Sequence, residues 1–102
     1  MKTAYICSPY RGDIERNKLY ARFVTLWAIK HGYTPITPHL YITECLNDDM
    51  PRQRCLGLAV GQALLNKCDI LICGTRYGIT DGMTEELRLA NKLKIKIIEV
   101  NL

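Results

Sequence analysis

The sequence has no long hydrophobic run and no run of basic residues. No stretch approaches the roughly 18 continuous apolar residues that a membrane-spanning helix needs, so we expect no membrane partner. Lysine and arginine are scattered along the 102 residues, although the formal net charge is +4. We therefore expect no nucleic-acid polymer as a partner. Pro9 and Arg11 interrupt the apolar start, which does not form a secretory signal, and we expect a cytoplasmic protein.

The five cysteines include no CxxC pair and are odd in number. Cys7 and Cys73 lie in apolar runs, where cysteine behaves as a small hydrophobic residue. These features indicate reduced thiols rather than a disulfide framework. Neither histidine, His31 or His39, has a cysteine or carboxylate at ligand spacing, so we expect no metal site.

Glycine-rich nucleotide motifs are also missing, since neither GxGxxG nor GxxxxGK[ST] occurs. Their absence excludes the usual dinucleotide and triphosphate cradles, and we expect no bound cofactor. Hydrophobic residues make up 48% of the chain and charged residues 24%, the balance of a globular protein. The length fits a single domain over residues 1–102.

Apolar periodicity predicts strands that alternate with helices. Such alternation is typical of a parallel sheet with helices on both faces. We expect a three-layer αβα, Rossmann- or flavodoxin-like α/β fold with about four strands in the order 2-1-3-4. The ligand site should lie beyond the carboxyl ends of the strands, where the order reverses. The predicted strands cover residues 3–7, 33–36, 69–73 and 95–100, and the predicted helices cover residues 14–30, 51–67 and 83–93.

Glu86 is the most informative residue. At about 100° per residue, it lies roughly 30° from the centre of the apolar stripe of the third predicted helix, whereas Glu85 lies roughly 130° away. The helix N-terminus favours its negative charge and burial opposes it, which suits a poorly solvated nucleophile. Alternatively, Glu86 only complements the helix dipole. The spacing leaves both interpretations open.

Other polar residues flank the expected site. Arg11 and Gly12 follow the first strand, where a guanidinium and loop amides suit a phosphate. Asn17 lies on the buried stripe of the first helix, either as a ligand contact or as an amide satisfied by nearby backbone. His39 is an acid, a base or a ligand contact, or else a structural loop histidine. Asp residues are expected to cap the helices, namely Asp13, Asp48 with Asp49, and Asp81, which also faces the site.

Six segments together resemble a small nucleoside 2-deoxyribosyltransferase-like family that is frequent in phage and bacterial genomes. No single segment is specific, but the ordered set spans nearly the whole chain. The start is also similar to that of 2′-deoxynucleoside 5′-phosphate N-hydrolases. In chain order the segments are YICSPYRGD, Asn17, PHLY, LNDD-P, LGL-x-x-G-x-x-LL-x-x-CD and GMTEEL.

The resemblance implies a double displacement in which Glu86 attacks the anomeric carbon of a deoxyribose. It also implies that Tyr5 positions Glu86 and that the Arg11 loop holds a 5′-phosphate. One position departs from the family, because the Asp expected eight residues before Asp69 is Gly61. Asp81 or Asp49 is the candidate replacement. The expected ligand-binding residues are Ser8, Pro9, Tyr10, Arg11, Gly12, Asn17, His39, Gly74, Gly82 and Met83.

These observations favour an enzyme that hydrolyses or transfers an N-glycosidic bond of a nucleoside or nucleotide. The alternative is a non-catalytic binder that sequesters a nucleotide or an NAD-derived signal. A structural or partner-binding module is disfavoured by the polar residues near one sheet end. A small chain and the family resemblance further predict a homodimer through the first or second helix, with Trp27 or Tyr20 at the contact.

Overall fold

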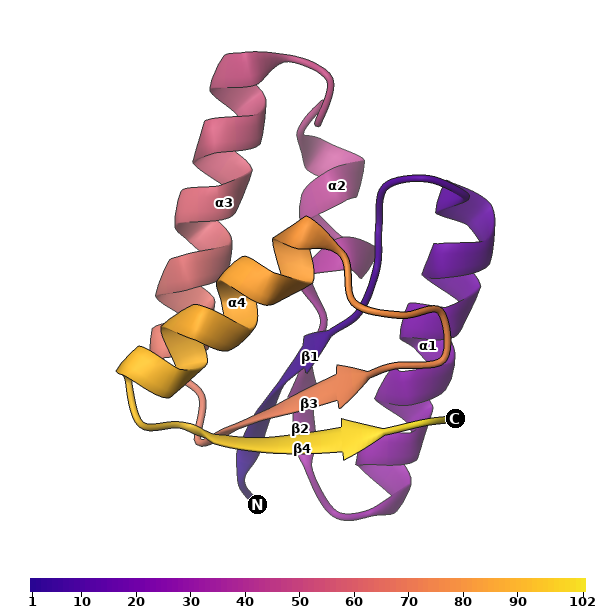
Figure 1. Cartoon of the computed structure of the whole chain (residues 1–102), viewed down its shortest axis with the longest axis vertical. Coiled ribbons are helices and arrows are strands. Elements are labelled where there is room, and N and C mark those ends of the chain that lie inside the picture. Colours follow the sequence, from indigo (N-terminus) through magenta and orange to yellow (C-terminus); the bar gives the residue numbers. More distant parts are fainter.

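The computed structural model describes residues 1–102 and contains one four-stranded sheet (Figure 1). All neighbouring strands are parallel, and their order is β2-β1-β3-β4, which confirms the predicted fold class and strand order. Cys7 of β1 lies opposite Cys73 of β3, so the two central strands end at the same edge. The strands are β1 (Thr3–Cys7), β2 (Thr34–Ile36), β3 (Ile70–Gly74) and β4 (Lys96–Val100).

Helices cover both faces of the sheet. One core joins α1 (Ile14–Lys30) to the side chains of Ala4, Ile6 and their neighbours on β3. The other joins α3 (Pro51–Asn66) and α4 (Asp81–Lys92) to the opposite face. Because successive side chains of a strand point to opposite faces, the buried residues 4–7 of β1 and 70–73 of β3 divide between the two cores. Figure 1 shows the resulting three layers.

Tyr5 and Cys7 belong to the face that α3 and α4 cover. Cys7 is the last residue of β1, so this face extends to the carboxyl end of that strand. Between β2 and α3 lie a short 3-10 helix, η1 (Pro38–Leu40), and the one-turn helix α2 (Ile42–Cys45). No helix is long and apolar enough to span a membrane.

The helix caps agree only in part with the sequence predictions. Asp13 caps α1, accepting a hydrogen bond of 3.2 Å from the Arg16 amide. The prediction that Asp81 caps α4 is wrong, because Thr80 accepts the bond from the Met83 amide and Asp81 is already helical. The prediction for Asp48 and Asp49 is also wrong, since Met50 precedes α3 without a side-chain cap. A proline at the start of α3 removes one of the amides that a cap would satisfy.

Candidate functional site

A cavity of about 490 Å³ opens beyond the carboxyl end of β1, and we call it the inner cleft. Its walls come from the loop after β1, from η1 and α2, from α3, and from the first turns of α4. This is the edge of the sheet at which the sequence predicts the ligand site. The predicted site residues that line it are Tyr5, Ser8, Tyr10, Arg11, His39, Asp81, Gly82, Met83 and Glu86.

The carboxylate of Glu86 meets two side chains of β1. The hydroxyl of Tyr5 donates a hydrogen bond to Glu86 Oε2, and the Cys7 thiol lies 3.7 Å from Oε1. Tyr5 and Cys7 are 3% and 0% exposed, so these partners are fixed by the core. Glu86 itself is partly buried and opens into the inner cleft. The predicted orientation of Glu86 toward the core therefore agrees with its contacts, whereas Glu85 is exposed and pairs with Arg88.

Burial raises the pKa of Glu86 to about 7, although the hydrogen bonds from Tyr5 and Cys7 act in the opposite direction. The loss of hydration has the larger effect, because burial removes more solvation free energy from the charged carboxylate than hydrogen bonds from two neutral donors restore. The pKa of Tyr5 is raised far above its ordinary range, first by burial and then by the charge of Glu86. Tyr5 thus remains a proton-bearing donor. Near neutral pH, Glu86 exists in both of its protonation states.

The end of β1 presents a second polar group. The hydroxyl of Ser8 is buried and has no hydrogen-bond partner in the protein, yet Ser8 lines the inner cleft. Nearby, the rings of Tyr10 and His39 stack with centroids 5.2 Å apart. Burial lowers the pKa of His39, so its imidazole is neutral at neutral pH. A buried hydroxyl without a partner is rare in folded proteins and suits a ligand group.

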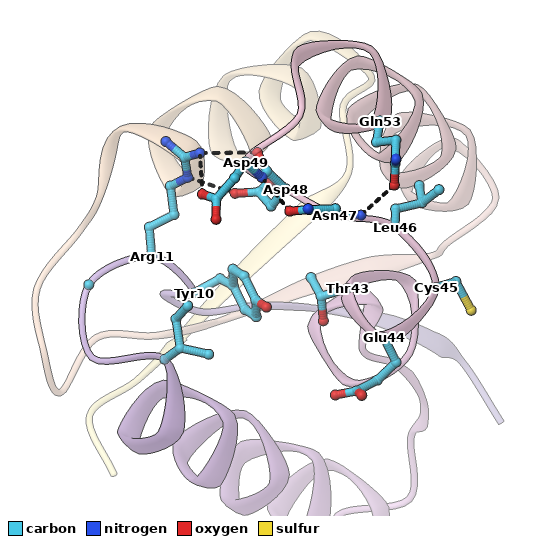
Figure 2. Close-up of a pocket in the computed structure, with 12 residues that line it drawn as sticks. Tyr10, Arg11, Thr43, Glu44, Cys45, Leu46, Asn47, Asp48, Asp49 and Gln53 are labelled. Carbon is cyan, nitrogen blue, oxygen red and sulfur yellow. Dashed lines mark hydrogen bonds and ion pairs between the residues drawn. The ribbon is translucent and has the colours of Figure 1, made fainter.

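Arg11 lies at the outer rim of the inner cleft. Its Nε is 2.6 Å from Asp48 Oδ2, and Asp49 Oδ1 lies 4.0 Å from Nη2 (Figure 2). Together these residues border a second hollow of about 670 Å³, which we call the outer hollow and which continues from the inner cleft. Arg11 is 54% exposed, so this ion pair is weak and a ligand can replace Asp48.

Four of the predicted residues do not line the inner cleft. Asn17 is buried, and its amide donates to the carbonyls of Tyr10 and Arg11, which agrees with the structural alternative. Gly74 packs beneath Tyr20, where an added Cβ would lie 2.9 Å from the ring. The other two are Pro9, which is buried in the loop after β1, and Gly12, which borders the outer hollow.

Sequence reasoning missed the wall that α3 contributes. Gly57 and Gly61 lie four residues apart, one above the other on the helix surface, and both line the inner cleft. A Cβ on Gly61 would lie 3.4 Å from the Tyr5 hydroxyl. Their spacing could have predicted this wall, because two glycines at i and i+4 leave a helix surface without side chains on one side, where a ligand can approach the backbone. No group of three or more potential metal ligands is present.

Several solved structures share this architecture. The chain superimposes on a 2-deoxyribosyltransferase from Bacillus psychrosaccharolyticus with a TM-score of 0.77 at 14% identity, covering 95% of this chain and 70% of that one. A CMP N-glycosidase of Clostridium botulinum matches with a TM-score of 0.58 at 18% identity, covering 96% and 67%. A 2-desoxiribosyltransferase from Leishmania mexicana matches with a TM-score of 0.62 at 17% identity, covering 97% and 63%.

The fold is therefore of the nucleoside 2-deoxyribosyltransferase type. The chain belongs to the family described as Domain of unknown function (DUF7768), whose model matches residues 2–100. No curated protein matches the sequence. At 14–18% identity the structural likeness concerns the fold, and this chain spans 63–70% of the length of those proteins.

Proposed function

We propose that the chain binds a nucleoside or nucleotide in the inner cleft and cleaves or transfers its N-glycosidic bond through Glu86. The observation that carries this proposal is a carboxylate at the cleft wall, held by a buried tyrosine that stays protonated. A nucleophile needs a fixed orientation and weak solvation, and Glu86 has both. The named enzymes of the same fold act on nucleosides or nucleotides and are in keeping with this chemistry.

The proposed reaction has two displacements. In the first, a Glu86 oxygen forms a bond to C1′, the C1′–N bond breaks, and its electron pair leaves with the base; a base that leaves as an anion takes up a proton from solvent. In the second, water or another base attacks C1′, the ester bond breaks and its electron pair returns to Glu86, and an attacking water loses one proton to solvent. Tyr5 donates to the Glu86 oxygens throughout and sets their direction. Asp81, exposed at the start of α4 and lining the inner cleft, is the proposed carboxylate that faces the base.

Other residues are proposed to bind the ligand. Ser8 offers its unpartnered hydroxyl, and Tyr10 with His39 offers a flat aromatic surface. Arg11 is proposed for a 5′-phosphate when one is present. Because its ion pair with Asp48 is exposed and worth at most about 1 kcal/mol, a charge-assisted bond to phosphate can replace it. Gly82 and Met83, in the first turn of α4, complete the proposed set.

Incubation with nucleosides and deoxynucleoside monophosphates, followed by chromatography of free base, tests the proposal. We expect base release by the wild-type protein, its loss in Glu86→Gln, and near-normal release in Glu85→Gln. The two variants are a matched pair, since both remove one carboxylate from the same helix turn, and only Glu86 contacts Tyr5. Full activity in Glu86→Gln would show that the nucleophile is assigned to the wrong residue.

The second candidate is a non-catalytic binder that sequesters a nucleotide or an NAD-derived compound. Gly61 favours it, because that position offers no side chain to assist a leaving base. The same incubation separates the two functions. A ligand that raises the melting temperature without any release of base indicates sequestration, because a binder of the folded state stabilises it.

A further inference from the structure

The wall of the inner cleft formed by α3 holds no acid. Toward the pair of Tyr5 and Glu86 it presents Gly61, and the other α3 residues on this wall carry amide, guanidinium or apolar side chains or no side chain at all. Asp48, between α2 and α3, is engaged by Arg11. A neutral purine or pyrimidine leaves C1′ slowly unless a general acid protonates it, and such assistance is worth about 10²–10⁴ in rate. The α3 wall cannot supply that proton.

The adjoining wall, formed by α4, carries negative charge. Asp81 and Glu86 both line the inner cleft, and neither forms an ion pair. The charge of Glu85 is offset by Arg88. The inner cleft has two cationic residues, and one of them, Arg11, is paired with Asp48. Arg54 is therefore the one cation of the cleft without a carboxylate partner. The cleft therefore favours a positive group beside α4, although the chain as a whole carries a net charge of +4.

The third feature is an uncharged polar floor. The rings of Tyr10 and His39 form a stacked pair, and the Tyr10 face attracts a flat cation. The Ser8 hydroxyl, in a residue only 1% exposed, lines the same cleft without a partner. A ligand hydroxyl or carboxamide satisfies it without any charge. Tyr10, His39 and Ser8 are all uncharged, so none of them is a cationic acid that could protonate a leaving base.

We infer that the substrate of the inner cleft is a nucleoside or nucleotide whose base carries a fixed positive charge, as a pyridinium does. The inference rests on the proposed function and names its substrate class. When Glu86 attacks C1′ and the C1′–N bond breaks, the electron pair neutralises the ring nitrogen, so the base leaves as a neutral pyridine. Water then displaces Glu86 from C1′, giving the free sugar and one proton to solvent. No acid is needed at any step.

Nicotinamide riboside, its 2′-deoxy counterpart and nicotinamide mononucleotide are the cationic probes, with adenosine, uridine and their 2′-deoxy forms as neutral probes. Each rate is divided by the spontaneous rate of the same compound, measured with the Glu86→Gln protein, because pyridinium nucleosides are intrinsically labile. We expect the acceleration to be at least about tenfold larger for the cationic probes. Reduced nicotinamide riboside, which is neutral with a similar outline, should compete at least about tenfold less well than the oxidised form.

Two variants test the cause. Gly61→Asp places a carboxyl beside Tyr5 and should raise kcat/KM for neutral nucleosides at least about tenfold, while Gly61→Asn, of equal size, should not. Asp81→Asn should raise KM for the cationic probes several-fold more than for the neutral ones. Circular dichroism verifies folding, and if Gly61→Asp does not fold, the Asp81→Asn result decides.

Equal acceleration of neutral and cationic probes by the wild-type protein would overturn the inference and leave the proposed function intact. Unchanged selectivity in Asp81→Asn would overturn it as well. If no probe is cleaved and none raises the melting temperature, the proposed function fails, and this inference fails with it.

Discussion

At the scale of single residues, burial raises the pKa of Glu86 to about 7. The sequence pattern predicted that Glu86 and not Glu85 points toward the core, because a helical stripe depends only on local spacing. The spacing gave no sign of its raised pKa, since that depends on Tyr5 and Cys7 of a strand about 80 residues away in the chain. The unpartnered hydroxyl of Ser8 was equally hidden, because its surroundings come from separate segments.

The pH dependence of base release should reflect Glu86. As the proposed nucleophile, Glu86 reacts in its ionised form, so the rate should rise with pH around the Glu86 pKa of about 7. Tyr5→Phe removes a hydrogen bond that lowers this pKa, and its rising limb should therefore lie at higher pH than that of the wild type. Tyr33→Phe, in the core on the other face of the sheet, is the matched control and should not move the profile. A Tyr5→Phe profile that coincides with wild type would count against this contact.

At the scale of elements, the strands and long helices follow local patterns, but the ends of helices do not. Thr80 caps α4 in place of Asp81, because the helix begins at Asp81, two residues before the predicted start at Met83. Asp48 faces Arg11 from across the rim instead of capping α3. The short helices between β2 and α3 also escaped prediction, since a single turn has too few residues to show a period.

Substitution by alanine should change the free energy of unfolding in opposite directions at Gly61 of α3 and Gly74 of β3. Gly61→Ala places its Cβ at an ordinary contact distance of 3.4 Å, so the gain in helix propensity should raise the free energy of unfolding by about 0.5–1 kcal/mol. Gly74→Ala would place its Cβ 2.9 Å from Tyr20, and overpacking should lower that free energy by about 1–3 kcal/mol. Urea unfolding measures both. A stabilised Gly74→Ala would mean that Tyr20 can move aside.

At the scale of the whole molecule, the alternation of strands and helices predicted the parallel sheet, and the doubly wound pattern suggested its strand order. The surface of a dimer contact was harder to predict from the sequence. Tyr20, one of the two residues expected at a dimer contact, is 5% exposed and packs in the core, so of the two only Trp27, partly buried on α1, remains a candidate. The outer face of α1 instead exposes Leu19, Phe23, Leu26 and Ile29, and α3 exposes Leu56, Leu58 and Val60.

We predict a homodimer through the outer face of α1 or of α3, because these exposed apolar side chains gain from burial against a second copy. Light scattering at micromolar concentration should give twice the chain mass. Phe23→Asp on α1 and Leu56→Asp on α3 identify the face, since only a charge within the contact yields a monomer. A monomeric wild-type protein would rule out the dimer.

The central claim, that Glu86 is the nucleophile, is tested most directly by trapping its ester. A 2′-fluoro nucleoside slows breakdown of a glycosyl ester, so the intermediate accumulates. Peptide mass spectrometry after acid quenching should then show one dehydrated fluorosugar on the peptide that contains Glu86, and no adduct in Glu86→Gln. An adduct on another residue, or base release with no adduct in either protein, would contradict the account.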